Sequence, residues 1–268
     1  MARLVVLNFT ALGGVAAALL VALALLHLIE QAVGRFVSHR LGWRVVLVTG
    51  WLGVPVHELS HLVAALVFRH RIVGWSLFDP DPTSGTLGYV RHAYRRRNPW
   101  QLAGSFFIGI APLCGGAAVL ALVLAWMVPP EHLLALLGRS GLTPAAPLTL
   151  DAGGAAALAR GLGDLGRGLP AQVWQARTPW LPLQVYLCIA VAAHLSPSRR
   201  DLAGGLLGGL FVAVVLAAAA TACAWSGTSL ASALGVVPVL ALLVGVTALF
   251  QALYAAVVAV IAARFGRR

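Results

Sequence analysis

Six long apolar runs, separated by shorter polar segments, dominate the chain. Each run is long enough to cross about 30 Å of hydrocarbon as an α-helix. They cover residues 10–33, 45–68, 101–128, 181–198, 203–226 and 233–263. The first run is longer than the apolar part of a secretory signal, and no small-residue cleavage site follows it, so we interpret it as a retained span. The pattern predicts an all-α polytopic membrane protein with about six transmembrane helices.

Two connecting segments carry patterns of their own. Residues 72–78 and 86–94 are rich in apolar and β-branched types and flank a turn of Asp, Pro and Gly residues. This arrangement predicts a β-hairpin at about 72–93. Segment 129–180 contains many Pro and Gly residues and weak amphipathic patches such as 131–138, so we expect a partly ordered external cap.

Composition agrees with a membrane protein and excludes several other classes. The 268 residues are 60% hydrophobic and only 10% charged, against about 45–50% and about 25% in soluble domains. The net charge is +11, and all 19 basic residues are arginine. Loop arginines of a membrane protein set its orientation. We therefore expect a lipid bilayer as the surroundings and no nucleic-acid partner.

The arginines also predict which side each loop faces. If the N-terminus is cytoplasmic, the cytoplasmic tails and the loops 69–100 and 199–200 hold 12 arginines, against three in the short outer loop near 35–44. Short loops with more arginine lie in the cytoplasm. The distribution predicts that both termini and the hairpin lie on the cytoplasmic side, and it fits a bacterial inner (cell) membrane.

The second apolar run contains ionisable residues that are costly in hydrocarbon. His57 and His61 stand four residues apart, with Glu58 between them. On a helix this spacing places both imidazoles on one face, where they can share a metal ion. The HExxH pattern is typical of zinc hydrolases, with the glutamate as general base. A histidine pair packed at a helix interface is the alternative, but three polar residues at this depth favour a metal site.

Two histidines need a third ligand. Asp201, at the cytoplasmic end of the fourth predicted span, is the candidate that we favour. Its alternative role is to cap the next helix, with Arg199 or Arg200 as its partner. His194, seven residues earlier, is a candidate to support a ligand or contact substrate. Glu30 is expected near the outer end of the first span, on the wrong side for the metal.

An HExxH motif inside a hydrophobic span, a hairpin, a further span and a later aspartate together resemble the site-2 protease family of intramembrane zinc metalloproteases. The family's second motif is typically Asn-x-x-Pro-x-x-x-x-Asp-Gly. Here His194 stands at the Asn position, the gap from Pro197 to Asp201 is one residue shorter, and Leu202 replaces the Gly. The resemblance covers about 45–201. Residues 1–44 (a span and an external loop) and 202–268 (two spans) are additions to that core.

The resemblance implies an intramembrane zinc endopeptidase that acts on membrane-embedded or juxtamembrane peptide segments of a membrane protein or peptide substrate. His57, His61 and Asp201 would hold Zn²⁺, and Glu58 would activate a zinc-bound water. The hairpin would pair with the unwound substrate as an added strand.

Two other functions use the same residues. A metal transporter or sensor needs a polar path across the bilayer, and the other spans offer few polar residues for one. A non-cleaving relative that only binds membrane segments would have no need of Glu58. Separately, the small residues Gly204, Gly205, Gly208 and Gly209 predict close helix packing, either within the chain or in a homo-oligomer.

Overall fold

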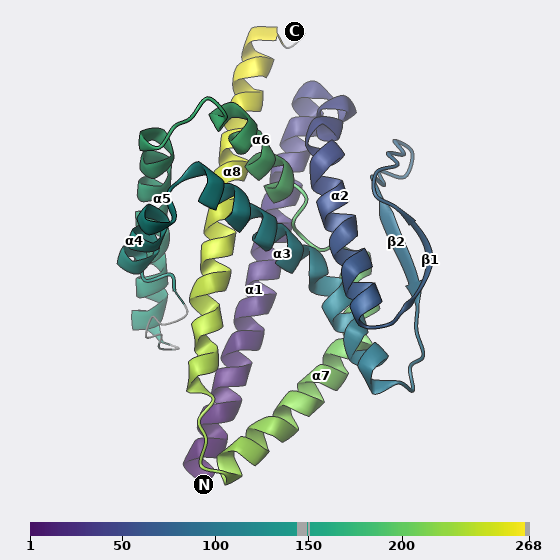
Figure 1. The fold of residues 1–268 in the computed structure, drawn as a ribbon, viewed down its shortest axis with the longest axis vertical. Helices are drawn as coiled ribbons and strands as arrows, with labels where there is room; N and C mark the ends of the chain where they lie inside the picture. The colour runs from purple at the N-terminus through teal and green to yellow at the C-terminus, as the bar shows by residue number, and fades with distance from the viewer. Residues whose placement is uncertain (144–148, 150, 266–268) are drawn as a thin grey trace. The chain divides into compact units, whose positions relative to one another are not determined.

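The structure, a computed structural model, describes residues 1–143, 149 and 151–265. Most of the chain is helical, and Figure 1 labels the elements. They are α1 (Ala2–Leu41), α2 (Trp43–Val67), β1 (Arg71–Ser76), β2 (Tyr89–Ala93), α3 (Pro99–Met127), α4 (Pro130–Ser140), α5 (Ala152–Gln175), α6 (Leu181–Ala192), α7 (Arg199–Trp225), a 3₁₀ turn (Ala231–Gly235) and α8 (Val236–Phe265).

Five of these helices are long and apolar enough to cross a membrane: α1, α2, α3, α7 and α8. The prediction of a mainly helical membrane protein is therefore confirmed. The fourth predicted span, 181–198, is helical only in the 12 residues of α6. A helix of that length is about 18 Å long, which is short of the hydrocarbon thickness.

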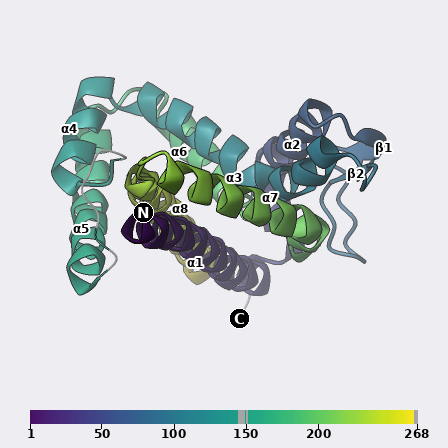
Figure 2. The same ribbon diagram turned by 90° about the horizontal axis from the view of Figure 1, so that it is seen from below.

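The predicted hairpin is present as a two-stranded antiparallel sheet that packs beside α2 (Figures 1 and 2). Its register pairs Arg71 with Ala93 and Trp75 with Val90. Asp81 organises the tip of the hairpin because its carboxylate accepts hydrogen bonds from Thr83 and Ser84. These bonds lower the pKa of Asp81 to about 2. Asp81 is thus a turn-forming residue.

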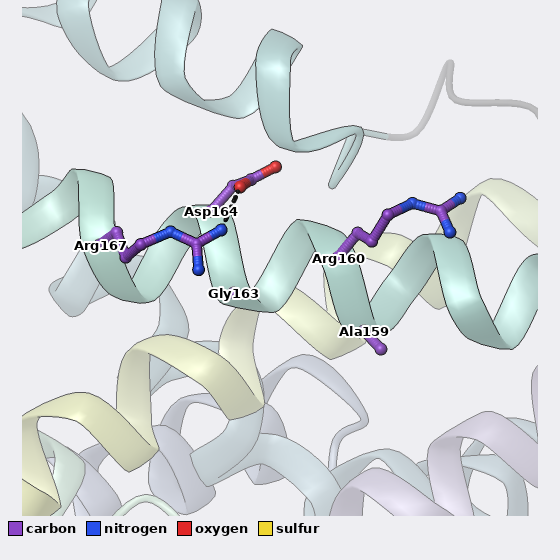
Figure 3. A pocket seen from close by; sticks show the side chains of 5 residues that line it. All are labelled: Ala159, Arg160, Gly163, Asp164 and Arg167. Atoms are coloured by element: carbon purple, nitrogen blue, oxygen red, sulfur yellow. Dashed lines mark hydrogen bonds and ion pairs between the residues drawn. The ribbon is translucent and has the colours of Figure 1, made fainter.

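Segment 129–180 contains more regular structure than its sequence predicts. The weak patch at 131–138 lies within α4, and Asp151 caps α5 by accepting a hydrogen bond from the backbone N–H of Gly154. The exposed side of α5 has a shallow hollow, where Arg167 and Asp164 form a 2.8 Å ion pair close to Arg160 (Figure 3).

The chain divides into two compact units, each assembled from separate stretches. One unit comprises Met1–Leu25, Val128–Arg177 and Val212–Val246. Within it, the Asn8 side chain donates hydrogen bonds to the carbonyls of Ala220 and Thr228 and accepts one from Leu230 N–H. The other unit comprises Leu26–Met127, Thr178–Phe211 and Thr247–Arg268. All residues of the HExxH motif and Asp201 belong to this second unit.

Contacts within the second unit fix the directions of its helices. On α2 and α3, Phe68 lies against Gly104 and Ser60 against Gly115, so these helices are antiparallel. On α2 and α6, Val48 contacts Tyr186 and Gly53 lies against Ala190. The helix α6 therefore runs in the same direction as α2.

The close approach of α2 to α6 depends on a glycine. A Cβ atom at Gly53 would overlap the backbone carbonyl of Ala190 and the ring of His194. Small residues of this kind let the backbones of membrane helices come close together. This contact brings the end of α6 to the turn of α2 that carries His57.

The start of α7 continues in the direction of α6. Gly109 of α3 lies against the Asp201 carbonyl, and Leu102, which precedes Gly109 in α3, lies against Gly208. The first turns of α7 are therefore antiparallel to α3 and parallel to α2. Residues 193–198, which we call the connector, are non-helical. They join α6 to α7 without reversing the direction of the chain.

Candidate metal centre

The two motif histidines point their Nε2 atoms at each other. They lie one helical turn apart on α2, with the Nε2 atoms 3.2 Å apart. Their rings meet at 70° with centroids 4.9 Å apart. The His61 residue is buried at 5% exposed, and the His57 side chain is 13% exposed.

The hydrogen-bond partners of the two Nδ1 atoms determine whether each Nε2 atom has a lone pair for a metal ion. The Nδ1 atom of His57 is 2.8 Å from the His194 carbonyl, and the Nδ1 atom of His61 is 2.8 Å from the Ile108 carbonyl. A carbonyl oxygen only accepts, so each Nδ1 carries the hydrogen. In a neutral imidazole Nε2 then holds a lone pair. Two lone pairs at 3.2 Å cannot form a hydrogen bond, whereas a metal cation would be bound by both.

Asp201 completes this group from the first turn of α7. Its Oδ1 atom is 3.4 Å from His61 Nε2, and its Oδ2 atom is 3.7 Å from His57 Nε2. The three ligand atoms of His57, His61 and Asp201 all lie within 4.8 Å of one another. Two imidazole nitrogens and one carboxylate oxygen are a donor set of catalytic zinc sites, which keep a further position for water. The residues therefore fit Zn²⁺.

Asp201 also has the capping role that was its alternative interpretation. Its Oδ2 atom accepts a 2.6 Å hydrogen bond from Ser198 N–H, and Ser198 Oγ accepts one from Asp201 N–H. This reciprocal pair is a capping box at the start of α7. Its ion-pair partners among the described residues are His57 and His61 rather than Arg199 or Arg200. One carboxylate thus both starts the helix and faces the two imidazoles.

Glu58 is buried beside the same cluster, with 8% of the residue exposed. The hairpin covers it: a Cβ atom at Gly88 would lie 2.9 Å from Glu58 Cγ and 2.9 Å from the Leu77 carbonyl. Among the described residues, the Glu58 carboxylate forms no hydrogen bond or ion pair. Its oxygens can therefore act on a water molecule held near the histidines.

His194 is predicted to support a ligand or contact substrate, and its contact with His57 comes from its backbone rather than its side chain. Its backbone carbonyl holds His57, while its ring Nε2 is 3.3 Å from the Thr49 hydroxyl. His194 does not belong to the group of possible ligands. It contributes to the centre by orienting an imidazole.

The position expected for Glu30 is wrong. Its Oε2 atom accepts a 3.3 Å hydrogen bond from Ser196 N–H in the connector, close to the candidate metal centre rather than remote from it. The sequence gives the depth of Glu30 within α1. It does not show that the connector lies beside Glu30 at the same level of α1.

A histidine pair between the hairpin and α3 was not foreseen as a unit. The Nδ1 atoms of His70 and His92 are 2.9 Å apart, and His70 Nε2 donates to the Gln101 carbonyl. Burial lowers the pKa of both rings, and for His92 the neighbouring His70 lowers it further, to about 4. His70 precedes the first strand and His92 lies in the second, and only the register of the hairpin brings them together.

The hollow on α5 shares no residue with this centre. Comparison with known proteins finds no matching family model, no matching curated protein and no matching solved structure.

Proposed function

We propose that this protein is an intramembrane zinc endopeptidase of the site-2 protease type. One observation carries the proposal. Two imidazole lone pairs, from His57 and His61, converge with the Asp201 carboxylate on one point beside Glu58, within helices apolar enough to lie in a membrane. Ionisable groups are costly in that setting and are retained for function.

The ligand set and the glutamate have separate tasks in this proposal. Bound zinc would supply Lewis acidity, which lowers the pKa of a coordinated water. The Glu58 carboxylate takes a proton from the attacking water and passes it to the leaving amine. The carbonyls of His194 and Ile108 keep both imidazoles in the tautomer that can bind metal.

The hairpin supports a peptide as the substrate. Each strand of the two-stranded sheet has one partner, so each also has an open edge with unpaired backbone groups. A helical membrane segment hides its peptide bonds within its own hydrogen bonds. An unwound segment could restore those bonds by pairing with an open edge. Gly88 follows the hairpin tip and lies directly against Glu58, so such a peptide would pass close to the centre.

Cleavage of a fluorescent transmembrane reporter peptide by the purified, zinc-loaded protein tests the proposal. We expect the Glu58→Gln variant to bind zinc as wild type does and to lose about 10²–10⁴-fold in kcat, which is the usual contribution of a general base. Glu131→Gln, on α4, is the matched control and should keep full activity.

The outcomes separate the alternatives. Zinc binding and zinc transport into vesicles without cleavage would favour a transporter. Zinc binding with neither activity would favour a non-cleaving relative. Equal cleavage by wild type and Glu58→Gln would refute the mechanism.

A further inference from the structure

We propose that Glu30 of α1 is a positioning residue of the metal centre, acting through the connector at 193–198. This inference rests on the proposed zinc peptidase function and adds to it a residue outside the 45–201 core. Glu30 touches neither the candidate ligands nor Glu58 by any hydrogen bond. Its carboxylate holds the backbone of the segment from which two parts of the centre arise.

The connector needs partners because it is non-helical backbone between two apolar helices. Backbone polar groups that lack a helical partner cost several kcal/mol in hydrocarbon unless other groups bond them. Side chains from other helices supply these bonds. Gln251 of α8 donates to the Ala192 carbonyl at 2.9 Å, and Glu30 of α1 accepts from Ser196 N–H at 3.3 Å. Thr49 of α2 meets the His194 ring.

Ser196 stands midway between two residues that act on the metal centre. Two positions earlier, the His194 carbonyl accepts the 2.8 Å hydrogen bond that fixes the His57 ring. Two positions later, Ser198 forms the capping box that holds the Asp201 carboxylate. A shift of the backbone at Ser196 would therefore move both the orientation of one ligand and the position of another.

The alternative is that Glu30 only stabilises helix packing. That role would accept any polar group of similar size and would leave the metal ligands in place. A positioning role instead requires an acceptor oxygen at the Ser196 N–H. Groups that orient metal ligands typically contribute 10–100-fold to metal affinity.

Cobalt binding by the purified metal-free protein in detergent distinguishes these roles without relying on peptidase activity. Titration gives the affinity, and the visible spectrum of bound Co²⁺ reports the ligand geometry. Glu30→Leu removes the acceptor, and we expect a loss of about 10–100-fold in affinity together with an altered spectrum. Glu30→Gln keeps an acceptor oxygen and should bind close to wild type. Gln31→Leu is the matched control because, among the described residues, the Gln31 side chain forms a hydrogen bond only with His27 of its own helix.

Each result has a definite consequence. Wild-type affinity and spectrum in folded Glu30→Leu would overturn the positioning role. If Glu30→Leu does not fold, Glu30→Asp takes its place, because it keeps the charge but withdraws the oxygen, and unchanged cobalt binding there would also overturn it. Failure of the wild-type protein to bind cobalt or zinc would instead refute the proposed metal centre.

Discussion

At the scale of single residues, the centre depends on hydrogen bonds that leave each ligand one available electron pair. Backbone carbonyls accept hydrogen bonds from the Nδ1–H groups of His57 and His61, and Ser198 N–H donates one to the Asp201 carboxylate. The candidate ligands are therefore oriented by the protein's own hydrogen bonds. This arrangement predicts separable effects for substitutions at neighbouring positions.

Substitution of Asp201 separates its two roles. Asp201→Asn keeps an acceptor for the cap but loses the charge, so we expect zinc affinity to fall by more than about 100-fold, beyond what loss of a supporting partner costs. Thermal stability without zinc should stay close to wild type. Ser198→Ala removes the hydroxyl side of the cap and should cost about 1 kcal/mol of stability with a smaller effect on affinity. Isothermal titration and thermal unfolding measure both, and the reverse pattern would contradict the assignment of Asp201 as a ligand.

A small change at Gly88 should affect the reaction without affecting metal binding. In Gly88→Ala the new methyl group would lie 2.9 Å from Glu58 Cγ and from the Leu77 carbonyl, so either the hairpin or Glu58 must move. We expect kcat to fall by about 10–100-fold, since misplacement by about 1 Å has effects of that size. Zinc affinity should be unchanged. Gly74→Ala is the control in the same hairpin, where the methyl meets only Tyr89 at 3.8 Å.

Some of the contacts that form the centre can be predicted from the sequence, and others cannot. The HExxH spacing alone places two imidazoles on one helix face, and His57 and His61 do lie so. The carbonyls that orient them come from Ile108 and His194, which are 47 and 137 residues distant. No local pattern encodes those partners, because a backbone carbonyl is present at every position. The role of Glu30 was missed for the same reason.

At the scale of elements, the hairpin is held to the start of α3 by a few side chains at its base. Gln101 accepts a hydrogen bond from Arg95 N–H and donates one to the Arg69 carbonyl, so a single side chain joins both ends of the hairpin. The pair of His70 and His92 adds a contact that depends on protonation. The sequence predicts both strands, but it does not show which residues anchor them.

The histidine pair makes hairpin docking sensitive to pH. The Nδ1–Nδ1 contact requires that one ring keeps a lone pair. The pKa of His92 is about 4 when docked, against 6.5 for a free histidine, so the undocked hairpin binds more protons between these values. Docking is therefore complete above about pH 6.5 and weakens as pH falls toward about 4.

Hydrogen exchange of the β1 and β2 amides in the metal-free protein measures this effect. We expect at least about tenfold greater opening at pH 4.5 than at pH 7, after correction for intrinsic rates, because one pKa unit corresponds to a tenfold change. His92→Gln should have weaker docking at pH 7 and little change with pH. An equally steep pH dependence in that variant would place the titration elsewhere.

At the scale of the whole molecule, the break between α6 and α7 determines how many times the chain crosses the membrane. The six apolar runs predict six crossings, and the arginine distribution places both termini in the cytoplasm. The helix directions within the second unit give a different count. Because α6 and the start of α7 follow one direction, we expect residues 181–208 to form a single broken crossing alongside α2, from the level of Val48 to that of Leu102 near the start of α3.

We therefore expect the two termini on opposite sides of the membrane. In α8, Gln251 contacts Ala192 and Tyr254 contacts Val45, so this helix runs toward the start of α2, where α1 also ends. Single-cysteine labelling in intact cells, at the N-terminus and at Arg264, tests the expectation in a background where Cys114, Cys188 and Cys223 are replaced. Labelling of both termini from the same side would show that α6 crosses the membrane separately, as six spans require.

The helix break also bears on how the candidate centre would take up a metal ion. Two lone pairs and a carboxylate that face one another repel unless something positive lies between them, and without a metal the smallest candidate is a proton shared by His61 and Asp201. A metal ion that entered the centre would then displace that proton. The backbone N–H of Ser198, at the end of the connector, binds the Asp201 Oδ2 atom and so helps to keep the carboxylate facing the two imidazoles. In the proposed zinc peptidase, loading of the centre would therefore exchange a proton for the metal ion, and zinc binding would weaken as the pH falls.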